Sequence, residues 1–119
     1  MQDKMKNIIV YTDWNDINDV ALTITTWANA TFPDRKPDSS LFKLVMEEIP
    51  ELLQHKKKHG IEDIGEEFAD CLILLLDLAM IWNINLSQAL SDKMYKNVER
   101  KWALDPSTGF YNHKDSVNE

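Results

Sequence analysis

The chain has little of several residue types, and each shortage excludes a class of protein. A single cysteine, Cys71, rules out an internal disulfide and fits a reducing compartment, so a cytoplasmic location is expected. Thirteen Lys and Arg against twenty Asp and Glu give a net charge of −7, which argues against a nucleic acid polymer as ligand. The longest apolar run, residues 71–76, is too short to span a bilayer, and no signal peptide is recognisable, so no membrane partner is expected.

What is present is ordinary for a globular protein. The 119 residues, 44% hydrophobic and 28% charged, predict a single domain, 1–119, with one core. Apolar periodicity, capping residues and loop residues predict an all-α, four-helix bundle without a confident strand. Asp13 is expected to cap the first helix, and Ser39 or Ser40 the second. The predicted parts are an N-terminal arm at 1–12 with a short extended piece at 8–10, helices near 14–30, 40–59, 61–83 and 86–103, and a C-terminal tail at 104–119.

The third predicted helix is apolar on nearly every side after its first turns. A helix of that kind is buried on most of its surface. In so small a chain, such burial requires a second subunit, so we expect a homodimer or homotetramer. The sequence does not decide between the two.

Two acidic clusters stand out against this apolar background. Residues 47–51 read Glu-Glu-Ile-Pro-Glu, and residues 67–70 read Glu-Phe-Ala-Asp. Members spaced i,i+3 lie about 60° apart on a helix, so each pair shares a face. A short link through Gly60 favours an antiparallel hairpin, in which the two pairs would meet. Converging carboxylates form an oxygen-rich site for a hard divalent cation such as Mg²⁺, which suggests phosphate chemistry.

A structural explanation of the acids remains open. Acidic residues in the first turn of a helix are favoured by its dipole, but Asp70 and Asp77 lie deeper in the apolar stretch. Those two could instead belong to buried ion pairs. Pro50 lies between two proposed ligands, and it either bends the helix so that Glu51 turns inward or is a tolerated kink.

Basic and aromatic residues supply candidates for substrate contacts. Lys93, Asn97 and Arg100 fall within about 60° of one another on the fourth predicted helix. They are either a solvated face or, beside a bound metal, a clamp for a triphosphate. Trp27, just before a Phe-Pro loop, is a candidate pocket residue. His55 and His59 fit a solvated helix end better than a metal site.

Together these motifs resemble a known family. Glu-Glu-x-x-Glu followed after a spacer by Glu-x-x-Asp is the signature of all-α MazG-like nucleoside triphosphate pyrophosphohydrolases. Residues 44–52 resemble the first motif helix and residues 67–70 the second. Lys93, Asn97 and the Arg-Lys-Trp of residues 100–102 resemble the closing elements of the family. Residues 27–33, Gly109 and His113 are similar to small phage and bacterial members.

The resemblance implies a reaction and a set of roles. Members hydrolyse an NTP or dNTP to the monophosphate and pyrophosphate with Mg²⁺, for which Mn²⁺ can substitute. It implies a dNTP-preferring enzyme that clears unwanted nucleotides or controls their pool, and it implies dimers or tetramers. The implied roles are metal ligation by Glu48, Glu51, Glu67 and Asp70, catalysis by Glu47 acting on the attacking water, and substrate binding by Lys93, Asn97, Arg100 and Trp27.

Two other functions are compatible with the composition. A non-catalytic helical oligomer could act as a protein-interaction module, with the acids in ion pairs. Metal dependence separates this alternative from the enzyme, because a metal bound only by the native state stabilises it. A di-iron carboxylate bundle is disfavoured, because the chain contains no Glu-x-x-His.

Overall fold

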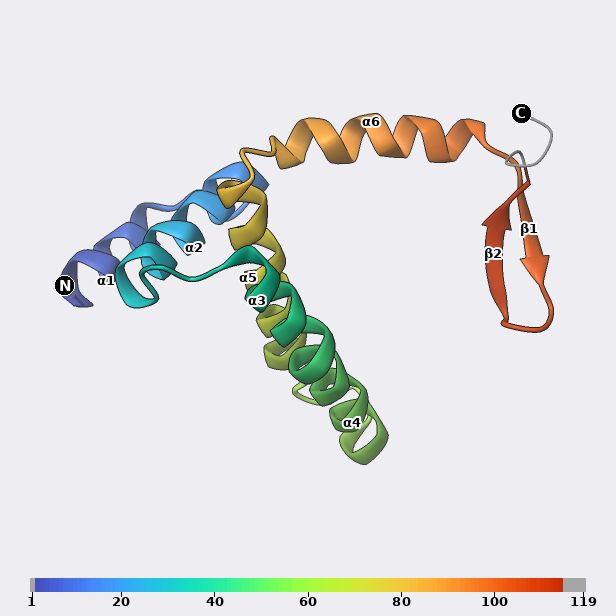
Figure 1. The fold of residues 1–119 in the computed structure, drawn as a ribbon, viewed down its shortest axis with the longest axis horizontal. Helices are drawn as coiled ribbons and strands as arrows, with labels where there is room; N and C mark the ends of the chain where they lie inside the picture. Colours follow the sequence, from blue (N-terminus) through green and yellow to red (C-terminus); the bar gives the residue numbers. More distant parts are fainter. Residues whose placement is uncertain (1, 115–119) are drawn as a thin grey trace. The chain divides into compact units, whose positions relative to one another are not determined.

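The computed structural model describes residues 2–114, and it is helical except for one hairpin (Figure 1). The predicted all-α fold class is confirmed. The chain forms two compact units, Met1–Leu86 and Ser87–Glu119. The elements are α1 (Gln2–Tyr11), α2 (Ile17–Thr31), α3 (Pro37–Lys43), the π-helical turn η1 (Leu44–Glu48), α4 (Ile49–His59), α5 (Ile64–Ile81), α6 (Leu86–Glu99), β1 (Trp102–Asp105) and β2 (Phe110–His113).

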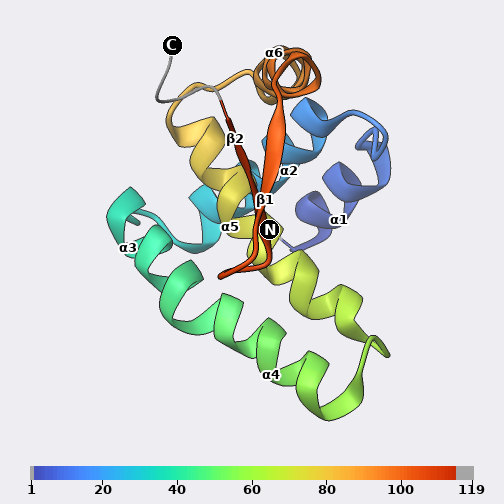
Figure 2. The ribbon, with the colours of Figure 1, turned by 90° about the vertical axis from the view of Figure 1, so that its right-hand side faces the viewer.

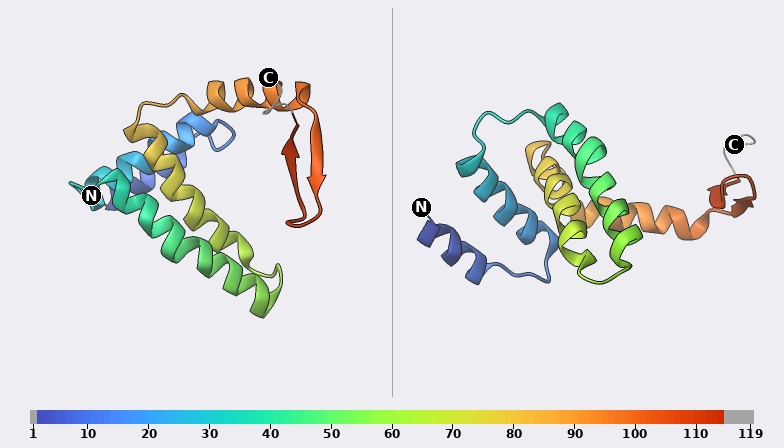
Figure 3. Two further views of the ribbon diagram at one scale, coloured as in Figure 1. Left: turned by 45° about the vertical axis from the view of Figure 1, so that its right-hand side comes forward. Right: turned by 90° about the horizontal axis from the view of Figure 1, so that it is seen from below.

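Helix α5 is the centre of the first unit, where it packs against α2, α3, η1 and α4. Figures 2 and 3 show α4 and α5 side by side as the predicted antiparallel hairpin. The hairpin turns at Gly60, which has φ of +69° and ψ of −138°, a conformation that residues with a Cβ rarely adopt. Asp63 follows with φ of +56°, so α5 begins at Ile64 and not at 61. This hairpin places both acidic motifs on neighbouring helices.

The N-terminal residues differ from the sequence prediction. The extended piece expected at 8–10 is wrong, because α1 spans these residues and packs against α2. The Thr12 hydroxyl is hydrogen-bonded to the Ile8 carbonyl and to the Thr23 hydroxyl, which fixes the end of α1 on α2. Asp16, not Asp13, caps α2, because its side chain accepts hydrogen bonds from the backbone of Asn18 and Asp19.

The second predicted helix is divided into three segments. It begins at Pro37, because the fixed φ of proline suits the first helical position, and neither serine caps it. The turn η1 interrupts it, with the Ile49 amide donating to the Leu44 carbonyl five residues earlier. Pro50 explains the interruption, because its ring clashes with the carbonyl four residues back in a regular α-helix. The wider π turn relieves this clash, and the turn contains Glu47 and Glu48.

The second unit contains a β-hairpin that the sequence did not predict. Strand β1 pairs antiparallel with β2, with Trp102 opposite His113 and Asp105 opposite Phe110. The expectation that α6 runs to about 103 is therefore wrong, since it ends at Glu99. The Asp105 side chain accepts hydrogen bonds from the Ser107 amide and hydroxyl, and Gly109 with φ of +77° closes the turn. Residues 115–119 of the predicted tail lie outside the described residues.

The buried core of the first unit is small. Its apolar members are Ala21, Ala28, Leu44, Cys71, Leu76, Leu78 and Ala79. Several large apolar side chains of α5 are exposed on the single chain, among them Phe68, Leu72 and Leu75. Among residues 2–114 no single helix is long and apolar enough to cross a membrane, although α5 and α6 taken together meet that test by length and composition.

Candidate active site

The four predicted metal ligands all act electrostatically on one buried residue, Cys71. Burial raises the pKa of the Cys71 thiol, and the negative charges of Glu48, Asp70, Glu51 and Glu67 raise it further. Glu48 lies in η1 and Glu51 in α4, whereas Glu67 and Asp70 lie in α5. The hairpin therefore places the two acidic motifs on neighbouring helices.

Lys43 is the cation nearest to the first acidic motif. Its ammonium lies 3.3 Å from a Glu47 carboxylate oxygen and 3.4 Å from one of Glu48. The hydrogen bond to Glu47 and the charges of both acids raise the pKa of Lys43. Only 12% of the Glu48 side chain is exposed, against 58% for Glu47. Glu48 is thus the better enclosed of the pair, which fits a ligand, while Glu47 retains access to solvent.

His55 holds a similar position beside the second motif. Its Nδ1 lies 3.5 Å from a Glu67 oxygen, and its Nε2 contacts the carbonyl of Glu62. The ring also packs against His59, with centroids 5.0 Å apart. The sequence predicted only a solvated helix end here. The i,i+4 spacing of the two histidines was the available signal, but it does not reveal a partner 12 residues away on the next helix.

The four carboxylates do not form a closed ligand set. Within residues 2–114, no group of three acidic, histidine or cysteine side chains is arranged to hold a metal ion. Two of the four acids have other partners: Glu48 pairs with Lys43, and Glu67 contacts His55. The chemistry of the set still fits the predicted metal, because all four donors are carboxylates, which suit hard divalent cations. The assignment of the four as ligands stays a prediction.

Asp77 has a different environment from the motif acids. Its side chain is 5% exposed and forms a bidentate pair with Arg35, through Nε and Nη2 at 2.7 Å each. The Thr25 hydroxyl also donates to it at 2.7 Å. Burial raises the pKa of Asp77, but the hydrogen bonds from Arg35 and Thr25 and the charge of Arg35 outweigh burial, and the pKa lies below its ordinary value. Asp77 is therefore a structural ion-pair partner.

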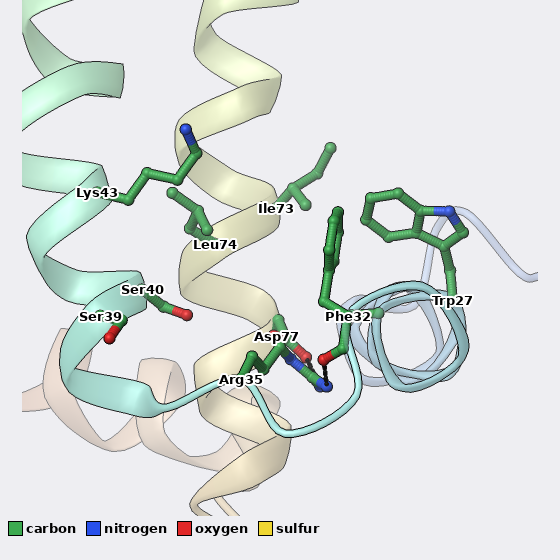
Figure 4. A pocket seen from close by; sticks show the side chains of 10 residues that line it. Trp27, Phe32, Arg35, Ser39, Ser40, Lys43, Ile73, Leu74 and Asp77 are labelled. Carbon is green, nitrogen blue, oxygen red and sulfur yellow. Dashed lines mark hydrogen bonds and ion pairs between the residues drawn. The ribbon is translucent and has the colours of Figure 1, made fainter.

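Next to this ion pair lies a pocket of about 260 Å³ (Figure 4). Trp27 and Phe32 form an aromatic wall, with ring centroids 5.3 Å apart and planes at 89°. Lys43, whose ammonium pairs with Glu47 and Glu48, also lines the pocket. Trp27 thus lines a pocket, while its contact with substrate stays a prediction. The other lining residues are Ala28, Arg35, Ser39, Ser40, Ile73, Leu74 and Asp77.

The predicted substrate-binding residues Lys93, Asn97 and Arg100 lie in the second unit. Asn97 accepts a hydrogen bond on its carbonyl from the Trp102 indole at 2.9 Å. Its side-chain oxygen is buried and is the one such atom without a hydrogen-bond partner among residues 2–114. An orphaned acceptor of this kind marks a polar position that a ligand or partner can satisfy. The contact of these three residues with substrate stays a prediction.

The fold defines the class: a helical protein whose α4–α5 hairpin carries carboxylates on both helices. Residues 36–103 match the MazG nucleotide pyrophosphohydrolase domain family, and the chain belongs to this family. The predicted family is thereby confirmed.

Two curated relatives and one solved structure that are similar to this chain come from bacterial viruses. A dATP/dGTP diphosphohydrolase of Salmonella phage PMBT28 is 41% identical over 86 residues, which are 72% of this chain but only 28% of that protein. A protein of the same name from Cyanophage S-2L is 38% identical over 80 residues, 67% of this chain and 71% of that protein. A solved MazG-like pyrophosphohydrolase of Cyanophage S-2L, bound to dGDP and three catalytic Mn²⁺ ions per active site, matches with a TM-score of 0.68 and 32% identity, covering 82% and 96% of the two chains.

Proposed function

We propose that this chain is a divalent-metal-dependent pyrophosphohydrolase that converts a dNTP and water to the dNMP and pyrophosphate. The observation that supports the proposal is the α4–α5 hairpin, which places Glu48 and Glu51 on one side and Glu67 and Asp70 on the neighbouring helix. Family membership supports the same enzyme class. The metal proposed is Mg²⁺, with Mn²⁺ as a substitute, and the solved relative that binds Mn²⁺ supports a divalent ion.

The proposed reaction assigns a task to each group. Glu48, Glu51, Glu67 and Asp70 would hold the metal, which when bound supplies neutralising charge for the triphosphate. Glu47, the more exposed acid, accepts a proton from the attacking water. The water oxygen bonds to the α-phosphorus, the bond from that phosphorus to the bridging oxygen breaks, and pyrophosphate leaves. Lys43, which lines the pocket and pairs with Glu47, would bind phosphate oxygens.

We propose deoxypurine triphosphates as the preferred substrates, with the base in the Trp27–Phe32 pocket. Support comes from the relatives named for dATP and dGTP, and from the solved relative with bound dGDP. Aromatic side chains suit a base because every base has a face that can stack. The biological role proposed is control or cleaning of the nucleotide pool, in the cytoplasm.

A homo-oligomer is part of the proposal. The exposed Phe68, Leu72 and Leu75 lie on one face of α5 at i, i+4 and i+7. Apolar side chains gathered on one helix face are costly in water, and a second copy of the chain would cover them. A homodimer or homotetramer both remain compatible with this face.

Pyrophosphate release from a panel of NTPs and dNTPs, with and without Mg²⁺ or Mn²⁺, tests the proposal. We expect metal-dependent release that is fastest with dGTP or dATP. Thermal unfolding measured in parallel should show a higher melting temperature with metal, because the ion binds only the native state. No release and no thermal shift, at a protein concentration that preserves the oligomer, would instead favour the non-catalytic interaction module.

Arg100→Ala tests the predicted phosphate clamp. The expected result is a higher KM for triphosphates with a smaller change in kcat, because Arg100 would bind phosphate in both the ground and transition states. Glu99→Ala, at the last residue of α6 and directly before Arg100 in the chain, serves as the control. An unchanged KM removes Arg100 from the clamp.

A further inference from the structure

The Arg35–Asp77 ion pair joins three separate parts of the chain at one end of the pocket (Figure 4). Thr25 comes from α2, Arg35 from the loop between α2 and α3, and Asp77 from α5. The guanidinium meets the carboxylate through two hydrogen bonds of 2.7 Å, and its Nη2 also reaches the Thr25 hydroxyl at 3.3 Å. A bidentate pair of this kind permits essentially one geometry.

The same guanidinium is connected to the aromatic wall. Arg35 Nη1 donates to the Phe32 carbonyl at 3.4 Å, and the Phe32 ring meets the Trp27 ring edge to face. Phe32 and Trp27 are both exposed, so little else covers the outer side of this wall. The position of Phe32 therefore depends on the loop, and Arg35 fixes the loop to α5 through Asp77.

We propose that Arg35 is a positioning residue that determines which nucleobase the pocket accepts. It does so by holding Phe32 against Trp27, while Asp77 and Thr25 hold Arg35. The side chains of Arg35 and Asp77 are paired with each other, and Asp77 is only 5% exposed. A base in the pocket would therefore contact the aromatic rings and not these two charged groups. This inference rests on the proposed function, because it assigns the base of the same substrate to this pocket.

A double substitution, R35M/D77L, separates positioning from stability. Replacing both members of a buried ion pair by apolar residues of similar size is often neutral or stabilising, so the variant should fold. The measured quantity is the ratio of kcat/KM for dGTP to that for dCTP, alongside the melting temperature. We expect the ratio to fall about tenfold, mainly through KM, with little change in melting temperature. Lys36→Met, in the same loop and outside the pocket, is the control and should keep the wild-type ratio.

A folded double variant with the wild-type ratio overturns the proposal. If the double variant does not fold, Arg35→Lys replaces it, because lysine keeps the charge but loses the two-pronged contact. The ratio should again fall, and an unchanged ratio in a folded Arg35→Lys variant overturns the proposal.

Equilibrium binding separates this inference from the proposed function. If the wild type releases no pyrophosphate from any nucleotide, the proposed function fails, and calorimetric binding of dGDP and dCDP with Mn²⁺ then tests the pocket. A wild-type preference for dGDP that R35M/D77L loses supports the positioning role without turnover. No binding of either nucleotide to the wild type overturns both proposals.

Discussion

Helix α5 carries two kinds of buried or half-buried carboxylate, and they differ in how their charge is balanced. Asp77 has a bidentate arginine and a hydroxyl, all within 2.7 Å. Among the described residues the ion-pair partner of Glu67 is His55 at 3.5 Å, and the charges of Glu67, Glu48, Glu51 and Asp70 all raise the pKa of Cys71. The chain thus neutralises Asp77 internally and leaves the motif acids as an excess of negative charge. An acid that is fully paired stabilises the fold, whereas clustered acids are stabilised by a cation from outside.

The largest expected effect separates these two kinds directly. Asp70→Asn should lower turnover by at least about a hundredfold. Substitution of a residue that only supports a metal ligand already costs about ten- to a hundredfold in metal affinity or activity, and Asp70 is itself a proposed ligand. Without metal, the variant should be as stable as the wild type or more so, since one of four mutually repelling charges is gone. Steady-state kinetics and thermal unfolding in a chelator check both statements. Full activity would remove Asp70 from the site.

Asp77→Asn is the matched substitution on the same helix and should have the opposite effect. It leaves the Arg35 charge without its partner, which should cost about 3 kcal/mol of unfolding free energy. This cost is at the low end of the usual range for breaking a buried ion pair, because the Arg35 side chain is still 14% exposed. Chemical denaturation measures the difference. If Asp77→Asn lowered the unfolding free energy no more than Asp70→Asn does, the distinction between the two acids would be contradicted.

Acid should weaken the contribution of Asp77. Burial raises the pKa of Asp77, but Arg35 and Thr25 lower it more, so the folded-state pKa is below that of the unfolded chain. The pair therefore adds stability that is fully present above about pH 4 and is lost as the pH falls through the folded-state pKa. The stability gap between wild type and Asp77→Asn should narrow as the pH falls from 6 to 3. A gap that stays constant over this range would show that Asp77 is not the titrating group.

The smallest effect is expected from Pro50→Ala. Alanine restores a backbone donor and removes the ring clash, which favours a regular α-helix in place of η1. Glu48 would then move relative to Glu51, and Mn²⁺ affinity should fall about tenfold, within the range for altered support of a metal site. Calorimetry measures the affinity. Pro106→Ala, in the hairpin turn, is the control, and equal affinities for the two variants would show that η1 does not position the acids.

Motif spacing could predict the hairpin and the placement of the acidic motifs on its two helices, because helix period and a short link determine both. It could not assign Asp77, which shares a face with the motif acids, because its partner Arg35 lies 42 residues away. Pro50 signalled a local distortion, but proline alone does not distinguish a kink from a π turn. The β-hairpin was missed because the turn residues 105–109 were recognised without recognising that short strands flank them.

Cys71 has a consequence for the handling of the protein. Thiolates, and not thiols, react with peroxide and alkylating reagents. Burial and four nearby carboxylates keep Cys71 in the thiol form, since each raises its pKa. The chain should therefore withstand mild oxidants and maleimides without a protective reductant, and its one cysteine would become a sensitive reporter of local unfolding around the acidic motifs.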